Sequence, residues 1–155
     1  VFISYSRADM QVADIVRLGL ATRGIDSWMD RVVGPGGDWM RQIEAALAKA
    51  ADVVVVLSPA LLSDERTVVR LEVELAVKLG KPLVPVTLPQ FVWPEAGAGP
   101  SWIQSLRRFN AVPVSFDYQD AFIDKLVRHC SETSRGRHPW WKFWRRRVGA
   151  ASLKL

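Results

Sequence analysis

Residues 52–58 read DVVVVLS, and this run decides the fold. Four valines and a leucine follow one another with no polar residue between them, which is typical of a strand buried on both faces of a sheet. Ser58-Pro59 then ends the run. The stretch is therefore interpreted as the central strand of a sheet that helices cover on both sides.

Strand-like and helix-like segments alternate outward from this run in both directions. Strands are predicted at residues 1–5, 25–29, 52–58, 83–88 and 111–114, and helices at 10–23, 39–50, 67–79, 101–108 and 117–134. This order predicts an α/β protein with a flavodoxin-like, five-stranded parallel sheet, helices on both faces and right-handed crossovers. Gly24 and Asp38 are expected to end one helix and cap the next. Pro85 inside its strand predicts an edge position or a bulge.

The size and composition suit one domain with a tail. The 155 residues are 49% hydrophobic, enough for a real core, and no run of about 18 apolar residues suggests a membrane span. A single cysteine, Cys130, favours a reducing compartment, so a cytoplasmic location is expected. The chain begins inside a strand-like run, which suggests a portion of a longer protein, and no secretory signal is visible.

The positive charge belongs to the end of the chain. Residues 135–155 hold seven of the 21 Lys/Arg residues and none of the 16 acids, so residues 1–134 are slightly acidic. We therefore expect a domain at 1–134, with no nucleic-acid partner for its core, and a basic, aromatic tail at 135–155. Residues 138–147 (HPWWKFWRRR) suit contact with a membrane surface, a second domain or the parent domain, and these alternatives stay open.

Glu72 lies where a carboxylate is not expected. In the predicted helix 67–79 (TVVRLEVELAVKL), steps of about 100° per residue place Glu72 in the middle of an apolar arc. That arc contains Val68, Leu75, Ala76 and Leu79, with Val69 at its edge, while the opposite, solvated face carries Arg70, Glu74 and Lys78.

A buried carboxylate must be paired, neutralised or placed at the floor of a cleft. One reading of Glu72 is a satisfied structural carboxylate that caps a loop or pairs with an arginine. The other is a functional group, since perturbed carboxylates gather at functional sites. Helical spacing leaves both open.

The expected sheet edge adds a location. Open parallel sheets bind ligands beyond the carboxyl ends of their strands, near the point where the strand order reverses. The residues predicted there are Ser4, Tyr5, Ser6 and Arg7 after the first strand, the loop 30–38, Ser58 with the loop after it, and the start of the Glu72 helix. Arg7 and Arg31 are candidate phosphate ligands, because a guanidinium matches phosphate geometry. Trp39 is a candidate for ligand or partner contact, and Trp28 for core packing.

The sequence lacks the motifs of several common phosphate-binding, metal and catalytic sites. The chain has neither GxxxxGK[ST] nor GxGxxG after a strand. With His129, His138 and one cysteine, a metal site is not expected, and no Ser-His-Asp or Cys-His set can be assembled at the sheet edge. A lone glutamate suits cleavage of a glycosidic bond whose leaving group is already cationic, because such a group needs no general acid.

Four ordered blocks resemble the TIR (Toll/interleukin-1 receptor/resistance) family, over about residues 1–132. The blocks are 1–6 (VFISYS) with Asp9, 24–30 with its WMD, 52–59 (DVVVVLSP), and 72–86 (EVELAVKLGKPLVPV). In NAD-cleaving members the catalytic glutamate stands nine residues before the lysine of the GK pair, which here is Lys81. The resemblance therefore implies that Glu72 is catalytic. Val68 takes the position of a tryptophan found in many members, which implies a place at the substrate.

The resemblance also implies an activity and an assembly. The activity is release of nicotinamide from NAD+, leaving ADP-ribose or a cyclic isomer, with NAD+ as substrate and no cofactor. Active sites are expected to be completed when TIR domains stack into a homo-oligomer or filament, through a loop that includes Asp30, Gly34, Pro35, Gly36 and Gly37. An effector of bacterial immunity or stress is the expected setting. The alternatives are a non-catalytic TIR adaptor with a structural Glu72, and a nucleoside-processing hydrolase or transferase.

Overall fold

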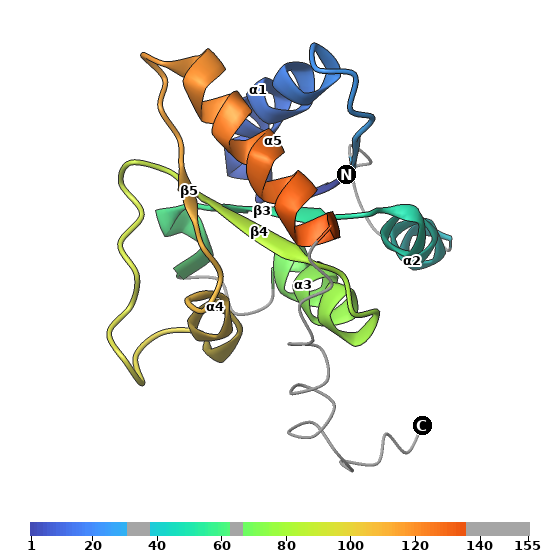
Figure 1. Ribbon diagram of the computed structural model, residues 1–155. Coiled ribbons are helices and arrows are strands. Elements are labelled where there is room, and N and C mark those ends of the chain that lie inside the picture. Colours follow the sequence, from blue (N-terminus) through green and yellow to red (C-terminus); the bar gives the residue numbers. More distant parts are fainter. Residues whose placement is uncertain (31–37, 63–66, 136–155) are drawn as a thin grey trace.

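A computed structural model describes residues 1–30, 38–62 and 67–135 (Figure 1). The strands are β1 (Phe2–Ser4), β2 (Trp28–Met29), β3 (Val53–Leu57), β4 (Leu83–Thr87) and β5 (Val112–Pro113). The helices are α1 (Met10–Ala21), α2 (Trp39–Lys49), α3 (Val68–Lys78), α4 (Ser101–Leu106) and α5 (Gln119–Arg135), with two 3-10 turns, η1 (Arg7–Asp9) and η2 (Pro59–Leu62). The predicted alternation of strands and helices is confirmed.

The five strands form one parallel sheet in the order β2-β1-β3-β4-β5. The chain moves from β1 to one side for β2 and then crosses to the other side for β3. The strand order therefore reverses at β1, and the carboxyl end of β1 is where ligands of such sheets are expected. The predicted flavodoxin-like fold is confirmed.

Helices cover both faces of the sheet, with α1 and α5 above it and α3 and α4 below it in Figure 1. Alternate residues of β3 serve the two faces: Val54 and Val56 pack with α1 and α5, while Val53, Val55 and Leu57 pack with α2, α3 and α4. All five side chains are fully buried. Burial of each such side chain contributes about 1.5–3 kcal/mol.

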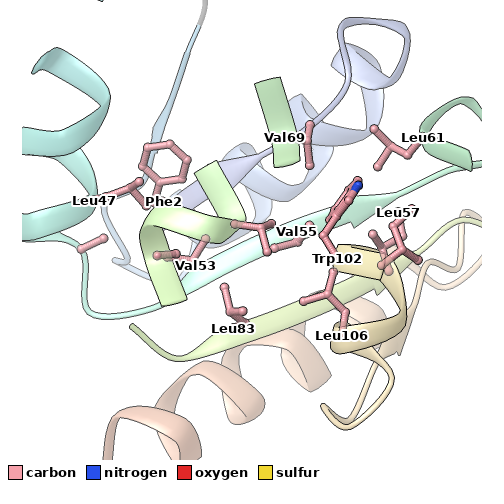
Figure 2. Packing of buried hydrophobic residues seen from close by; sticks show 14 of the residues in the cluster. Phe2, Leu47, Val53, Val55, Leu57, Leu61, Val69, Leu83, Trp102 and Leu106 are labelled. Carbon is pink, nitrogen blue, oxygen red and sulfur yellow. The ribbon is translucent and has the colours of Figure 1, made fainter. Parts of the chain in front are cut away.

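Figure 2 shows the core between the sheet and helices α2, α3 and α4, where side chains from β1, β3 and β4 pack with those of the three helices. Phe2 of β1 stacks on Trp28 of β2, with ring centroids 4.9 Å apart. This contact confirms the core-packing role expected for Trp28. It also joins the two strands whose ends carry the site described below.

The edge position suggested by Pro85 is wrong, because β4 pairs with β3 on one side and β5 on the other. Leu88 N donates to Leu57 O on β3, and Thr87 O accepts from Val114 N beside β5. Backbone groups alternate sides along a strand, so the Pro85 nitrogen faces β5. Pairing with β5 starts only at Val86, one residue later. A proline can therefore stand in this inner strand without losing a ladder hydrogen bond.

The buried face of α3 is rotated from the predicted arc. Val68 and Leu79 are 39% and 42% exposed, whereas Val69, Val73 and Ala76 are buried against the sheet. Apolar residues of α3 occupy most of its circumference, so their spacing alone could not show which side packs against the sheet. Glu72 is buried on either assignment, and Arg70 pairs with Glu74 at 2.8 Å on the solvated side as expected.

The helix ends show which capping signals hold. Gly24 has φ +71°, and the backbone N–H of the following Ile25 donates to Leu20 O, so the predicted stop of α1 is confirmed. Asp38 occupies the N-cap of α2, but its side chain makes no capping hydrogen bond and instead lies 3.7 Å from Arg41. Lys81 Nζ donates to Ala48 O and Ala50 O at 2.6 and 2.8 Å, which satisfies carbonyl groups at the end of α2.

In the part of the chain that the structure describes, no helix is both long and apolar enough to cross a membrane. The contacts predicted for residues 138–147 lie outside the described residues and stay predictions.

Candidate active site

A cavity of about 260 Å³ lies at the carboxyl ends of β1 and β2, beside the start of α3. Its walls come from three places: the turn after β1, the end of β2, and the first turns of α3. The lining residues are Tyr5, Ser6, Arg7, Asp30, Thr67, Val68 and Glu72. Of the predicted site residues, the structure therefore brings Tyr5, Arg7, Asp30, Val68 and Glu72 together around one cavity.

Helix α3 places Glu72 on the cavity wall. Thr67 is the N-cap, and its side-chain oxygen accepts from Val69 N at 3.3 Å, which fixes where the helix begins. Glu72 then stands in the second turn, on the stripe with Val69, Val73 and Ala76 that packs against the sheet. Only 4% of Glu72 is exposed, and it still lines the cavity.

Ser4 is the hydrogen-bond partner of Glu72. The Ser4 hydroxyl, at the end of β1 and fully buried, donates to Glu72 Oε2. Burial raises the pKa of the Glu72 carboxyl from 4.5 to about 8, the Ser4 hydrogen bond opposes this rise, and the nearby charge of Asp30 adds to it. In the described residues, the partner of this carboxylate is thus a neutral hydroxyl, and no guanidinium neutralises it.

Asp30 is fixed at the end of β2 by two aromatic side chains. Tyr5 Oη donates to the Asp30 backbone oxygen at 2.6 Å, and Trp39 Nε1 donates to Asp30 Oδ2 at 2.6 Å. The second of these bonds joins the end of β2 to the first residue of α2. Asp30 was predicted at the sheet edge within the loop 30–38 and as part of a self-association loop, and the structure places it with Glu72 at the cavity.

Trp39 and Ser58 were predicted to contact the substrate, but they do not line this cavity. Trp39 is partly buried against the core and reaches the site only through Asp30. Ser58 is buried, and its hydroxyl donates to Asp9 Oδ2 at 2.6 Å. Burial raises the pKa of Asp9, and the Ser58 hydrogen bond opposes the rise. Ser58 is therefore the hydrogen-bond partner of a buried carboxylate on η1, a role that its position in the sequence did not predict.

Ser6 also lines the cavity, within the stretch 4–7 that was predicted at the sheet edge. Thr67 was not named as a site residue, although the start of its helix was predicted at this edge. It could have been found, because a threonine immediately before an apolar helix is a common N-cap. Arg31, Gly34, Pro35, Gly36 and Gly37 lie outside the described residues, so their predicted roles stay predictions.

The chemistry of the cavity is that of a carboxylate site. Among residues 1–30, 38–62 and 67–135, no group of three or more His, Cys, Asp or Glu side chains could hold a metal ion. Glu72 lies deepest, Asp30 is half-buried, and Arg7 is exposed at the side of the turn after β1. A buried carboxylate in such a place can stabilise positive charge that develops on a bound molecule.

Comparisons with known proteins agree with the fold and extend it. The family model described as "TIR domain" matches residues 1–127. The "NAD(+) hydrolase sarm1" of Drosophila melanogaster is 32% identical over 135 residues, and "NAD(+) hydrolase SARM1" of Danio rerio is 30% identical over 135 residues. Each alignment covers 83% of this chain, which spans only 10% and 19% of the two relatives.

A solved structure resembles the fold as well. The TIR domains in a structure of the activated Roq1 resistosome, which directly recognises the pathogen effector XopQ, match with a TM-score of 0.60 and 15% identity. The match covers 82% of this chain and 96% of that one. At this identity the similarity supports the fold alone.

Proposed function

Because this chain belongs to the TIR domain family, we propose that it is an NAD+ glycohydrolase. The reaction cleaves the bond between nicotinamide and ribose and leaves ADP-ribose or a cyclic isomer. Two relatives at 30–32% identity are NAD(+) hydrolases by name. They support hydrolysis of NAD+ as the general activity, and the specific reaction is our proposal.

The observation that carries the proposal is the position of Glu72. This carboxyl is almost completely buried, is bonded within the described part of the chain to a serine hydroxyl, and still lines a cavity at the sheet edge. A purely structural carboxylate gains nothing from facing a cavity, and its burial without a cationic partner costs stability. Such a cost is typical of functional sites.

The proposed chemistry uses the charge of Glu72. When the bond from ribose C1′ to the pyridinium nitrogen breaks, its electron pair neutralises the ring, and nicotinamide leaves without needing a proton. The ionised Glu72 stabilises the positive charge that develops on the ribose, and water then adds to C1′ and releases a proton. With a pKa of about 8, the protonated form of Glu72 is favoured at pH 7 in the empty site. A bound cationic ring favours the ionised form.

Two other residues have proposed substrate roles. Arg7, exposed in the turn after β1, is a candidate for the diphosphate, since guanidinium groups pair with phosphate oxygens. Val68 is exposed at the start of α3 and lines the cavity, so it offers an apolar surface to the substrate. Ser4, behind Glu72, acts on the carboxylate rather than on the substrate.

We also propose that activity depends on self-assembly through TIR–TIR contacts, in the setting of an immune or stress effector. This proposal rests on the resemblance to the TIR family, in which assembly through such contacts is expected. The non-catalytic adaptor is the alternative. It has one observation in its favour, because the Ser4–Glu72 bond also ties β1 to α3 and could serve the fold alone.

The experiment is to incubate the concentrated protein with NAD+ and follow nicotinamide release by chromatography. We expect turnover by the wild type and a loss of at least a hundredfold in Glu72→Gln, a change that keeps the size of the side chain. The control is Glu74→Gln, since Glu74 lies on the same helix but pairs with Arg70 in solvent. An inert wild type at every concentration supports the adaptor. Equal turnover by Glu72→Gln removes Glu72 from the mechanism.

The same assay tests assembly. If TIR–TIR contacts complete the site, nicotinamide release per molecule rises with protein concentration as oligomers form. The oligomeric state is followed in parallel by light scattering. Constant activity per molecule in a monodisperse monomer rejects this part of the proposal and leaves the hydrolase assignment intact.

A further inference from the structure

Glu72 shares its cavity with a second carboxylate, Asp30. The two come from separate elements, α3 and the end of β2, and the fold brings them to one small space. Like charges repel, so the charge of Asp30 disfavours the ionised form of Glu72 in the empty site. The repulsion is relieved when a positively charged group enters between them.

We infer that Asp30 is a specificity-determining residue that selects a cationic group in the cavity, beside the carboxylate that acts on it. This inference rests on the proposed function, and it adds a residue to which the family resemblance assigned only a place in a self-association loop.

The hydrogen bonds of Asp30 support a fixed position. Trp39 Nε1 holds one carboxylate oxygen at 2.6 Å, and Tyr5 Oη holds the backbone oxygen at 2.6 Å. An indole N–H and a phenol O–H carry no charge, so these two hydrogen bonds orient Asp30 and add no positive charge of their own.

The other charges around the cavity complete the pattern. Arg7 on η1 also lines it, but its side chain is exposed, whereas Asp30 is half-buried and Glu72 is buried. Asp9, on the same turn, is bonded to Ser58, and Arg70 and Glu74 pair on the solvated face of α3. Among the described lining residues, the two more buried charged groups, Asp30 and Glu72, are thus acidic, and the exposed one, Arg7, is basic. NAD+ has a cationic ring at one end and an anionic diphosphate next to it, so its polarity matches the cavity.

The effect of Asp30 on Glu72 gives a second line of support. The charge of Asp30 contributes to the raised pKa of Glu72, as expected of two carboxyl groups that line one cavity. An entering cation would be attracted by Asp30 and, at the same time, would favour the ionised form of Glu72.

The test compares NAD+ with NADH, which share the diphosphate and differ in the charge of the nicotinamide ring. Calorimetry on Glu72→Gln, in which turnover is blocked, gives dissociation constants with and without Asp30→Asn. Asparagine keeps the acceptor for Trp39 Nε1 and removes the charge. We expect Asp30→Asn to weaken NAD+ about tenfold and to change NADH less than twofold. Asp26→Asn is the matched control, because Asp26 is exposed on the same connection and does not line the cavity.

A second measurement is independent of binding and turnover. Carboxyl-detected NMR of the wild type and of Asp30→Asn reports the pKa of Glu72, which we expect to fall when the charge of Asp30 is removed. Equal loss of NAD+ and NADH binding, or an unchanged Glu72 pKa, overturns the inference. A wild type that prefers NAD+ over NADH through Asp30 but releases no nicotinamide supports the inference and overturns the proposed function. A protein that binds neither nucleotide overturns both.

Discussion

The Ser4 hydroxyl donates a hydrogen bond to Glu72 Oε2 and so joins the end of β1 to the second turn of α3, 68 residues further along the chain. Both side chains are buried. The bond favours the ionised carboxylate, while burial and the charge of Asp30 favour the protonated acid. The charge state of Glu72 is therefore set by neighbours that act in opposite directions.

Ser4→Ala should move the pH dependence of activity. Loss of the hydroxyl removes the interaction that lowers the pKa of Glu72, so this pKa rises further above 8. A hydrogen bond to a charged group contributes about 1.5–3 kcal/mol, or roughly one to two pKa units. Plots of kcat/KM against pH should show the acidic limb shifted to higher pH by about that amount. Ser105→Ala is the control, since the Ser105 hydroxyl donates to Trp102 O within α4, and an unmoved limb in Ser4→Ala contradicts the assignment.

Glu72→Gln should stabilise the protein at alkaline pH. The pKa of Glu72 is raised in the folded state, from 4.5 to about 8, so its contribution is fully present below pH 4.5 and is lost as pH rises through 8. Glutamine does not ionise and avoids this loss. Urea unfolding at pH 5 and pH 8 should show the free energy of unfolding of the variant gaining on the wild type by a few kcal/mol between these values. An equal difference at both values would mean that Glu72 titrates normally.

Loss of the Ser58 hydroxyl, which bonds to Asp9, should lower the free energy of unfolding more than loss of an exposed serine hydroxyl. Ser58→Ala leaves the buried Asp9 carboxylate without the hydroxyl that donates to it at 2.6 Å, which should cost about 1–3 kcal/mol in free energy of unfolding. Ser101→Ala, at an exposed position of α4, should change it by less than about 0.5 kcal/mol. Chemical denaturation measures both. A cycle with Asp9→Ala should give a coupling of about 1 kcal/mol, and additive losses would show that the bond contributes nothing.

Much of the fold was predictable, because the pattern of apolar residues and the positions of glycine carry it. The valine run of β3 and the alternation around it predicted the parallel sheet, and Gly24 predicted the end of α1. The side of α3 that packs was not predictable, since apolar residues occupy most of that helix and the sheet decides which of them are buried. The place of Pro85 also depends on where β5 begins, which is a property of the neighbouring strand.

The candidate site was predictable in part for similar reasons. Glu72 could be found because a carboxylate among apolar residues is unusual, and Tyr5 and Arg7 because they follow a strand. The bond between Ser58 and Asp9 could not be read from a local pattern, since it joins residues 49 apart in the chain. The place of Asp30 beside Glu72 likewise depends on how β2 lies against β1, which only the assembled sheet determines.

Gly19 should be required by the packing of α1 on α5. A Cβ at this position would lie 2.5 Å from Ile123 Cγ1 and 2.6 Å from its Cδ1, and Ile123 is buried. Alanine in a helix is favoured over glycine by about 1 kcal/mol, but overpacking of a core costs about 1–3 kcal/mol, so Gly19→Ala should lower the free energy of unfolding. Ile123→Ala removes the clashing atoms, and on that background the same substitution should be neutral or stabilising. Thermal and urea unfolding of the two single variants and the double variant gives this cycle. A loss from Gly19→Ala that persists in the double variant would place its cause elsewhere than in the contact with Ile123.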